Sequence, residues 1–158
     1  MRKILLCAAT FSLTTVVLVS AVYGNPITDA RKVPHIISSV QFPQSKQRIV
    51  RHTFRLQIPQ HSNPVSRLTI NVPVGLTVSN KISVSDRSGR KVDTNISVDG
   101  NKVILGFTEP ILPETELKIS MKDVKILGRT NAWLYKVYAR LIGINADLPI
   151  GFARFRVY

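Results

Sequence analysis

Alternating hydrophobic and polar residues run along the chain from residue 49 to its last residue. In HTFRLQIP, Phe54, Leu56 and Ile58 share one parity, while polar side chains occupy the other. Three further stretches, SRLTINVP, LKISMKDV and PIGFARFRVY, repeat this alternation. A period of two is typical of β-strands that bury one face. The pattern therefore predicts strands within 52–59, 66–73, 117–124 and 149–158.

Turn residues predict a hairpin and separate the remaining strands. In KVDTNISVDGNKVILGF, alternation on both sides of Asp99-Gly100-Asn101 predicts two paired strands, because Asp-Gly favours tight hairpin turns. The stretch LTVSNKISVS at 76–85 predicts one or two short strands, which end at the turn residues DRSGR. For AWLYKVYARL at 132–141, the apolar spacing also allows a helix, but aromatic and β-branched residues favour a strand.

Together these segments amount to seven to eight strands and no convincing helix. Such a pattern predicts an all-β fold, a single antiparallel β-sandwich of immunoglobulin-like layout. We assign the sandwich domain to residues 49–158. Residues 25–48 contain three prolines and little periodicity, so we expect an extended lead-in there, in which HIISSVQF pairs at a sheet edge.

The first 24 residues have the pattern of a secretory signal peptide. Arg2 and Lys3 precede an apolar run of 16 residues, Ile4 to Val19, which is shorter than the roughly 20 residues of a membrane-spanning helix. Small residues follow at cleavage spacing, which predicts cleavage after Ala21 or Gly24; an uncleaved N-terminal anchor is the alternative. We expect a Sec-type signal that exports the protein to the periplasm or the cell exterior, or to a thylakoid lumen, and no membrane span after signal cleavage.

Removal of residues 1–24 leaves a strongly basic chain without cysteine. Without Arg2 and Lys3, 20 of the 22 Lys and Arg residues remain against 9 Asp and Glu, a net charge of +11. The loss of Cys7 excludes disulfides and thiolate metal sites. A basic surface attracts anions, while export and dispersed Lys and Arg disfavour nucleic acid. We expect an anionic envelope polymer or an acidic protein surface as the partner, or a basic surface with no dedicated partner.

No group of residues has the spacing of a catalytic, cofactor or metal site. His52 and His61 bracket a predicted strand that rises about 3.3 Å per residue, so we expect them to lie too far apart to share a metal ion and to be surface residues. Asp86, Asp93 and Asp99 fall in or beside turns, where they cap backbone N–H groups. No serine stands in a Gly-x-Ser-x-Gly motif, and no glycine-rich loop could cradle a phosphate. We therefore expect no enzymatic activity, no cofactor and no metal.

The order of these segments resembles a known family. HTFRLQIPQHSNPVSRLTINVP, EPILPETELKISMKDV, WLYKVYAR and the close LPIGFARFRVY are together similar to short secreted cyanobacterial proteins classed as a domain of unknown function, which end in a Gly-x-x-Arg-Phe-x-x-Tyr-like strand. The resemblance runs from about Pro34 to Tyr158. Glu114 stands where a glycine is commoner, and Asn131-Ala132 stands where Asn-Pro is common. The resemblance implies export in an organism with an outer membrane and thylakoids, and a β-sandwich; it implies no activity.

Positive charge recurs on the non-core parity of the predicted strands. A solvated face is the ordinary place for such charge, where Lys and Arg also oppose edge-to-edge aggregation. If these residues converge on one sheet beside aromatic residues, they would bind an anionic polymer. The candidate binding residues are Lys118, Lys122, Lys136, Tyr138, Arg140, Arg154, Arg156 and Tyr158. We expect an exported non-enzymatic protein with an envelope binding or structural role; the alternative is an accessory or assembly factor for a periplasmic or thylakoid-lumen protein complex.

Overall fold

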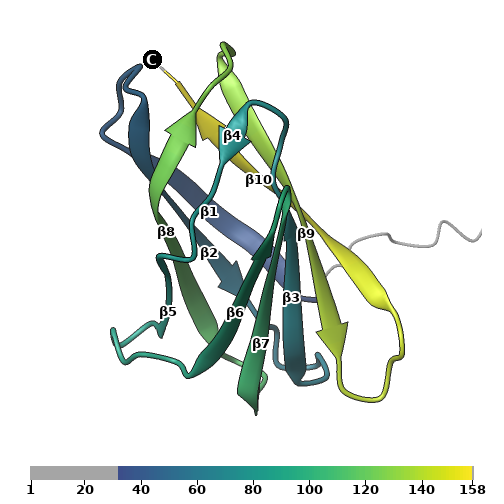
Figure 1. Cartoon of the computed structure of the whole chain (residues 1–158). Coiled ribbons are helices and arrows are strands. Elements are labelled where there is room, and N and C mark those ends of the chain that lie inside the picture. The colour runs from purple at the N-terminus through teal and green to yellow at the C-terminus, as the bar shows by residue number, and fades with distance from the viewer. Residues whose placement is uncertain (1–31, 158) are drawn as a thin grey trace, which may run out of the picture.

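The computed structural model describes residues 32–157, and these residues form ten β-strands (Figure 1). The strands are β1 (His35–Phe42), β2 (Ile49–Gln57), β3 (Val65–Asn71), β4 (Leu76–Thr77), β5 (Ile82–Asp86), β6 (Thr94–Asp99), β7 (Lys102–Ile111), β8 (Glu116–Ile126), β9 (Ala132–Leu141) and β10 (Asp147–Arg156). This part of the chain has no helix that is long and apolar enough to cross a membrane. The predicted signal peptide, residues 1–24, lies outside the described residues.

The strands form two antiparallel sheets of five strands each. Sheet A has the order β1-β2-β8, and β4 and β5 both pair with the far edge of β8. Sheet B has the order β10-β9-β3-β7-β6. The sheets face each other, and at one side β1 lies along β10, where the Ser39 hydroxyl donates a hydrogen bond to the Arg154 carbonyl (Figure 1). The prediction of an antiparallel β-sandwich is confirmed.

Alternation along each strand decides which side chains enter the core. In β2, Phe54 and Leu56 are fully buried, as the pattern in HTFRLQIP predicts. The segment 132–141 forms β9, which confirms a strand rather than a helix. The strand number exceeds the prediction because 35–42 forms a full strand, paired with β2 at the edge of sheet A, and 76–86 yields both β4 and β5.

A chain of polar side chains crosses this core and corrects the expectation that His52 is a surface residue. The His52 side chain is fully buried. Its Nδ1 atom lies 2.7 Å from the Tyr135 hydroxyl, and its Nε2 atom lies 3.0 Å from Gln41 Oε1. The Gln41 amide nitrogen donates to the carbonyl oxygens of Pro43 and Ser45, so its Oε1 atom is the acceptor. His52 therefore donates a hydrogen bond from Nε2, accepts one from the Tyr135 hydroxyl at Nδ1 and is neutral.

The period of two explains why a histidine lies here. His52 shares the parity of Phe54, and its ring stacks on Phe155 with 4.2 Å between the centroids. Burial lowers the pKa of His52 from 6.5 to about 4 and raises the pKa of Tyr135. Hydrogen bonds at both ring nitrogens remove the free-energy cost of burying them unpaired. The same bonds attach the connection at 43–48 to the core.

The connections between strands gather at two ends of the sandwich. The first, called here the basic end, holds the β1–β2, β3–β4 and β8–β9 connections, residues 43–48, 72–75 and 127–131; it is uppermost in Figure 1. The β6–β7 turn at 100–101 lies beside the β3–β4 connection, where the Val72 N–H donates to the Asn101 carbonyl. Backbone hydrogen bonds from Ile126 to Arg48 and from Leu127 to Gly75 join these connections. The second, called the mixed end, holds the connections at 58–64, 87–93, 112–115 and 142–146.

Candidate functional site

The predicted binding residues do not converge on one sheet. Lys118 and Lys122 project from β8 on the outer face of sheet A, where both are exposed. The remaining described candidates belong to β9 and β10 on the outer face of sheet B; they are Lys136, Tyr138, Arg140, Arg154 and Arg156. Tyr158 lies outside the described residues. The seven described candidates therefore divide between two opposite faces.

Part of the set on sheet B forms a basic patch with exposed apolar side chains. Lys136 lies opposite Phe152 in the β9–β10 pairing, and Arg154 lies opposite Leu134. Phe152 is 56% exposed and Leu134 is 49% exposed. We call the group Leu134, Lys136, Phe152, Arg154 and Arg156 the β9–β10 face. Within the described residues, its three cations make no ion pair with a carboxylate.

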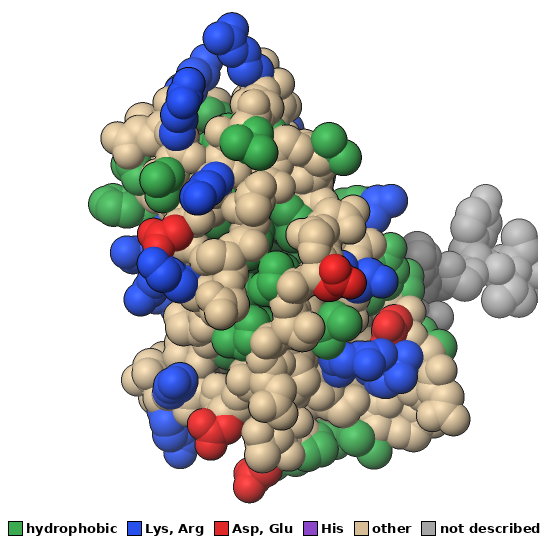
Figure 2. Space-filling model, in the orientation of Figure 1, with side chains coloured by type: hydrophobic (Ala, Val, Ile, Leu, Met, Phe, Trp, Pro, Cys, Tyr) green, Lys and Arg blue, Asp and Glu red, His purple; other side chains and the backbone are tan. Residues whose placement is uncertain are grey.

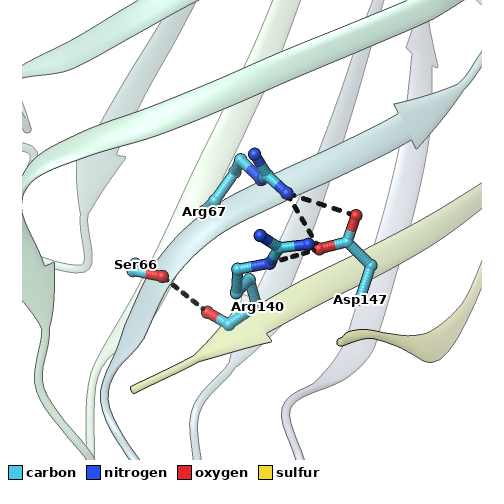
Figure 3. Close-up of polar contacts among 4 residues, drawn as sticks. All are labelled: Ser66, Arg67, Arg140 and Asp147. Atoms are coloured by element: carbon cyan, nitrogen blue, oxygen red, sulfur yellow. Dashed lines mark hydrogen bonds and ion pairs between the residues drawn. The ribbon is translucent and has the colours of Figure 1, made fainter. Parts of the chain in front are cut away.

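Arg140 differs from these cations because it belongs to a polar cluster (Figure 3). Its Nε atom donates to Asp147 Oδ1 at 2.8 Å, while Arg67 Nη2 reaches both carboxylate oxygens at 3.2 and 3.4 Å. Desolvation opposes ionisation of Asp147, but the hydrogen bonds and charges of Arg67 and Arg140 outweigh it and lower the pKa of this carboxyl. The Ser66 hydroxyl also donates to the Arg140 carbonyl. Arg140 is thus engaged in structure.

The cations of sheet A also lie among carboxylates. Lys118 is the strand neighbour of Arg55, which pairs with Glu116 at 3.3 Å. Lys122 is next to Asp123, whose carboxylate lies 2.6 Å from Lys81 Nζ. The hydrogen bond and charge of Lys81 lower the pKa of Asp123. Positive charge on this face is therefore partly neutralised.

A hollow lies at the basic end, where the sequence predicted no site. It has a volume of about 570 Å³, within the roughly 300–1,000 Å³ range of ligand pockets. Its lining comes from the β1–β2 connection, the end of β8, the β8–β9 connection and the start of β9. The lining residues are Lys46, Gln47, Arg48, Ile126, Leu127, Gly128, Arg129, Thr130, Asn131, Trp133 and Val157.

Trp133 forms the apolar part of this hollow because two glycines let it pack closely. A Cβ atom added to Gly75 or Gly128 would lie 3.1 Å from the Trp133 ring, which is closer than most side-chain contacts. Gly75 also has a φ of 94°, which favours glycine. The Trp133 Nε1 atom is buried and has no hydrogen-bond partner among the described residues. A buried donor without a partner lowers the stability of the fold.

The hollow is cationic. Lys46, Arg48 and Arg129 line it without a carboxylate in its lining, and none of the three forms an ion pair within residues 32–157. Figure 2 shows Lys and Arg side chains at the upper end, with hydrophobic side chains between and below them. Sequence reasoning missed this site because its residues lie in turns about 80 positions apart, which only the β2–β8 pairing brings together.

The described residues offer no metal centre. No three His, Cys, Asp or Glu side chains between 32 and 157 lie close enough together to hold a metal ion. Asp86 acts as the turn pattern predicts, since its Oδ1 atom accepts hydrogen bonds from the backbone N–H groups of Ser88 and Arg90.

The fold defines the class of protein as an antiparallel β-sandwich of immunoglobulin-like layout. The chain belongs to the family described as Protein of unknown function (DUF2808), which matches residues 27–137, more than half of its 158 residues. This confirms the resemblance to a family of unknown function. A search of curated proteins gives no significant match.

Solved structures of an adhesin domain and a pilin subunit have a similar fold. The N-terminal domain of the Streptococcus gordonii adhesin Sgo0707 is similar with a TM-score of 0.54 and 14% identity, over 82% of this chain and 33% of that chain. BcpA, the major pilin subunit of Bacillus cereus, is similar with a TM-score of 0.53 and 12% identity, over 78% of this chain and 40% of that chain. The chain thus spans well under half of either protein, and these identities show a shared fold alone.

Proposed function

We propose that this is an exported, non-enzymatic binding domain whose β9–β10 face holds an anionic envelope polymer. The observation that carries the proposal is the set of unpaired cations on that face, Lys136, Arg154 and Arg156, beside the exposed ring of Phe152. Several separated cations suit a polymer that repeats its negative charge. An exposed aromatic ring adds a surface on which sugar rings pack.

A polymer is favoured over an acidic protein by the composition of the face. The cores of protein interfaces are depleted in Lys and in charge generally. Here three of the five side chains are charged, and they stand in two adjacent strands of an antiparallel sheet. Contacts of this kind are dispersed and weaken as salt screens them.

Export and the absence of catalysis rest on separate support. The apolar segment and cleavage spacing within residues 1–24 support a Sec-type signal, and the fold is shared with an adhesin domain and a pilin subunit. The periplasm, the cell exterior and the thylakoid lumen of a cyanobacterium are the destinations consistent with that signal. Mass spectrometry of the protein recovered after expression in a Gram-negative host tests signal cleavage. A new N-terminus at Val22 or Asn25 is expected, whereas an intact Met1 contradicts cleavage.

The binding test compares matched pairs of cations on the two outer faces. We expect the protein to bind a polyuronate probe at low salt. Arg154→Ala together with Arg156→Ala should weaken binding about tenfold, because exposed charge contacts are each worth up to about 1 kcal/mol. Lys118→Ala together with Lys122→Ala, which removes the same charge from sheet A, should have less effect.

Three outcomes contradict the proposal. They are binding that is unchanged after the Arg154 and Arg156 substitutions, equal losses in both double variants, and binding that does not fall with added salt. If the protein does not bind polyuronate but binds one acidic protein through the β9–β10 face, the partner is a protein and not a polymer.

A further inference from the structure

Three hollows meet at the basic end and form one continuous surface. The 570 Å³ hollow shares Gly128, Arg129 and Trp133 with a second hollow of about 330 Å³, which Val74 and Leu134 also line. It shares Arg48 and Leu127 with a third hollow of about 400 Å³, which Ile49 and Lys125 also line. The surface adjoins the β9–β10 face at Leu134, which belongs to both. Its cations are different residues, so it does not depend on the function proposed for that face.

Large apolar side chains stand out from this surface. Val74 is 94% exposed, Leu127 is 76% exposed and Ile49 is 54% exposed. Each belongs to or borders one of the connections at the basic end, and each lines one of the three hollows. A scattered apolar side chain on a surface is ordinary, but several together around a hollow mark an interaction site.

Cations alternate with these apolar side chains. Lys46, Arg48, Lys125 and Arg129 are all exposed and line the hollows, whose combined linings contain no Asp or Glu. Figure 2 shows no red side chain among the blue ones at this upper end in that view. A partner must therefore present negative charge and an apolar layer together.

We infer that the basic end docks on an anionic lipid bilayer, with a headgroup phosphate in the 570 Å³ hollow and Val74, Leu127 and Ile49 in the interfacial layer. Anionic lipids attract basic side chains near their surface, and apolar side chains bind at the boundary of headgroups and acyl chains. A soluble anion would occupy the hollow but leave the apolar side chains in water. The lipid bilayer is the partner that matches both halves of the surface.

Trp133 provides a fluorescence signal for docking at the basic end. It is the sole tryptophan of the chain, and its Nε1–H lacks an acceptor among the described residues. The Trp133 ring lines the 570 Å³ hollow. Docking at the basic end is therefore expected to change Trp133 fluorescence, and lipids with brominated acyl chains to quench it.

The experiment uses protein purified after export, with its N-terminus established by mass spectrometry. Vesicles of phosphatidylcholine alone are compared with vesicles that also contain phosphatidylglycerol, by sedimentation and by Trp133 fluorescence. Binding is expected with phosphatidylglycerol and is expected to weaken with salt. Arg48→Ala with Arg129→Ala should weaken it about thirtyfold, since each cation near an anionic surface contributes roughly fivefold.

Apolar substitutions separate lipid docking from simple charge attraction. Val74→Ser with Leu127→Ser changes two exposed side chains and should weaken binding about tenfold or more without loss of stability. Matched controls come from the mixed end. Arg87→Ala with Lys91→Ala and the single change Leu112→Ser, all at exposed positions, should leave vesicle binding unchanged.

Four outcomes overturn the inference. If the protein binds both vesicle types equally, it does not recognise the anionic headgroup. If the basic-end and mixed-end variants lose binding equally, the basic end is not the binding site. If glycerophosphoglycerol in solution binds as tightly as the vesicles, the ligand is a free phosphate compound. If Arg154→Ala with Arg156→Ala abolishes vesicle binding while the basic-end variants retain it, the membrane contact is the β9–β10 face. Loss of polyuronate binding with intact vesicle binding contradicts only the proposed function.

Discussion

The two ends of the sandwich differ in how their charges are matched. At the mixed end, or in the strand ends that lead to it, lie four of the five ion pairs of the described residues; they join Arg55 to Glu116, Arg67 and Arg140 to Asp147, and Arg90 to Asp86. The basic end has Lys46, Arg48, Lys125 and Arg129 around its hollows and no carboxylate in their linings. Cations that repel one another destabilise a fold, so the basic end favours binding and the mixed end favours stability.

The polar interior supports the same distinction. His52 and Gln41 hold the β1–β2 connection, which carries Lys46 and Arg48, and each of their side-chain nitrogens has a hydrogen-bond partner. The neighbouring Trp133 donor is unsatisfied. A wall of the hollow is therefore fixed in place, while one of its donors is left without a partner.

The largest effect on stability is expected from truncating Trp133, which lines the hollow at the basic end. Trp133→Ala removes a buried aromatic side chain and should lower the free energy of unfolding by about 3–5 kcal/mol. Denaturation in urea measures it. Hydrogen exchange should show that protection is lost first around residues 127–131 and 43–48, and later at the mixed end.

Trp133→Phe is the matched control. It keeps most of the aromatic bulk and removes the buried N–H group, which costs about 1–3 kcal/mol while unpaired. We therefore expect a stability within about 1 kcal/mol of the parent. A loss as large as that of Trp133→Ala would show that the N–H group has a partner that stabilises the fold.

Acid should loosen the attachment of the basic end to the core. Above pH 6.5 neither the folded nor the unfolded chain protonates His52, and its contribution is fully present. Below 6.5 the unfolded chain binds a proton that folded His52, with its pKa of about 4, does not bind. The free energy of unfolding should thus fall by up to about 3 kcal/mol as the pH decreases from 6.5 to 4.

Denaturation at a series of pH values tests this slope. The side chains packed against His52 are Gln41, Tyr135, Phe155 and Met121 from four strands, and none of them titrates in this range. His52→Gln should be less stable at neutral pH and should lose the part of the slope between pH 6.5 and 4. An unchanged slope in that variant would assign the acid sensitivity to other groups.

A smaller effect on stability is expected from removing a carboxylate that pairs with two arginines at the mixed end. Asp147→Asn leaves Arg67 and Arg140 without their shared carboxylate, and it should lower stability by about 1 kcal/mol, since the three side chains are only partly exposed. Arg48→Gln at the basic end removes a cation that has no carboxylate partner among the described residues. It should cause no loss of stability, and equal losses in the two variants would end the distinction between the ends.

The strand pattern was predictable because one rule decides it. Alternation places Phe54, Leu56, Tyr135 and Phe155 in the core, and the structure confirms each. The same rule also placed His52 inside, but the general frequency of histidines at surfaces suggested otherwise. Parity, which is a property of the local chain, was the better guide than residue type.

The candidate site was only partly predictable. Strand parity placed Lys136, Arg154 and Arg156 on a solvated face, and the pairing of β9 with β10 then brought them together. Parity does not say which sheet a strand joins, so Lys118 on β8 was grouped with residues of the opposite face. The hollow at the basic end depends on turns from three parts of the chain, which have no periodic signal.

The smallest effect concerns a single backbone conformation at the mixed end. Glu114 has a φ of 62°, a left-handed conformation that costs free energy for residues other than glycine. Glu114→Gly should therefore raise stability by about 0.5 kcal/mol, because relief of this strain exceeds the added freedom of the unfolded chain. Glu114→Ala removes the same charge but keeps the conformation, and it should give no gain in urea denaturation. If both variants gain stability equally, the charge of Glu114 rather than its backbone conformation is the cause. Carboxylates would then lower the stability of the mixed end.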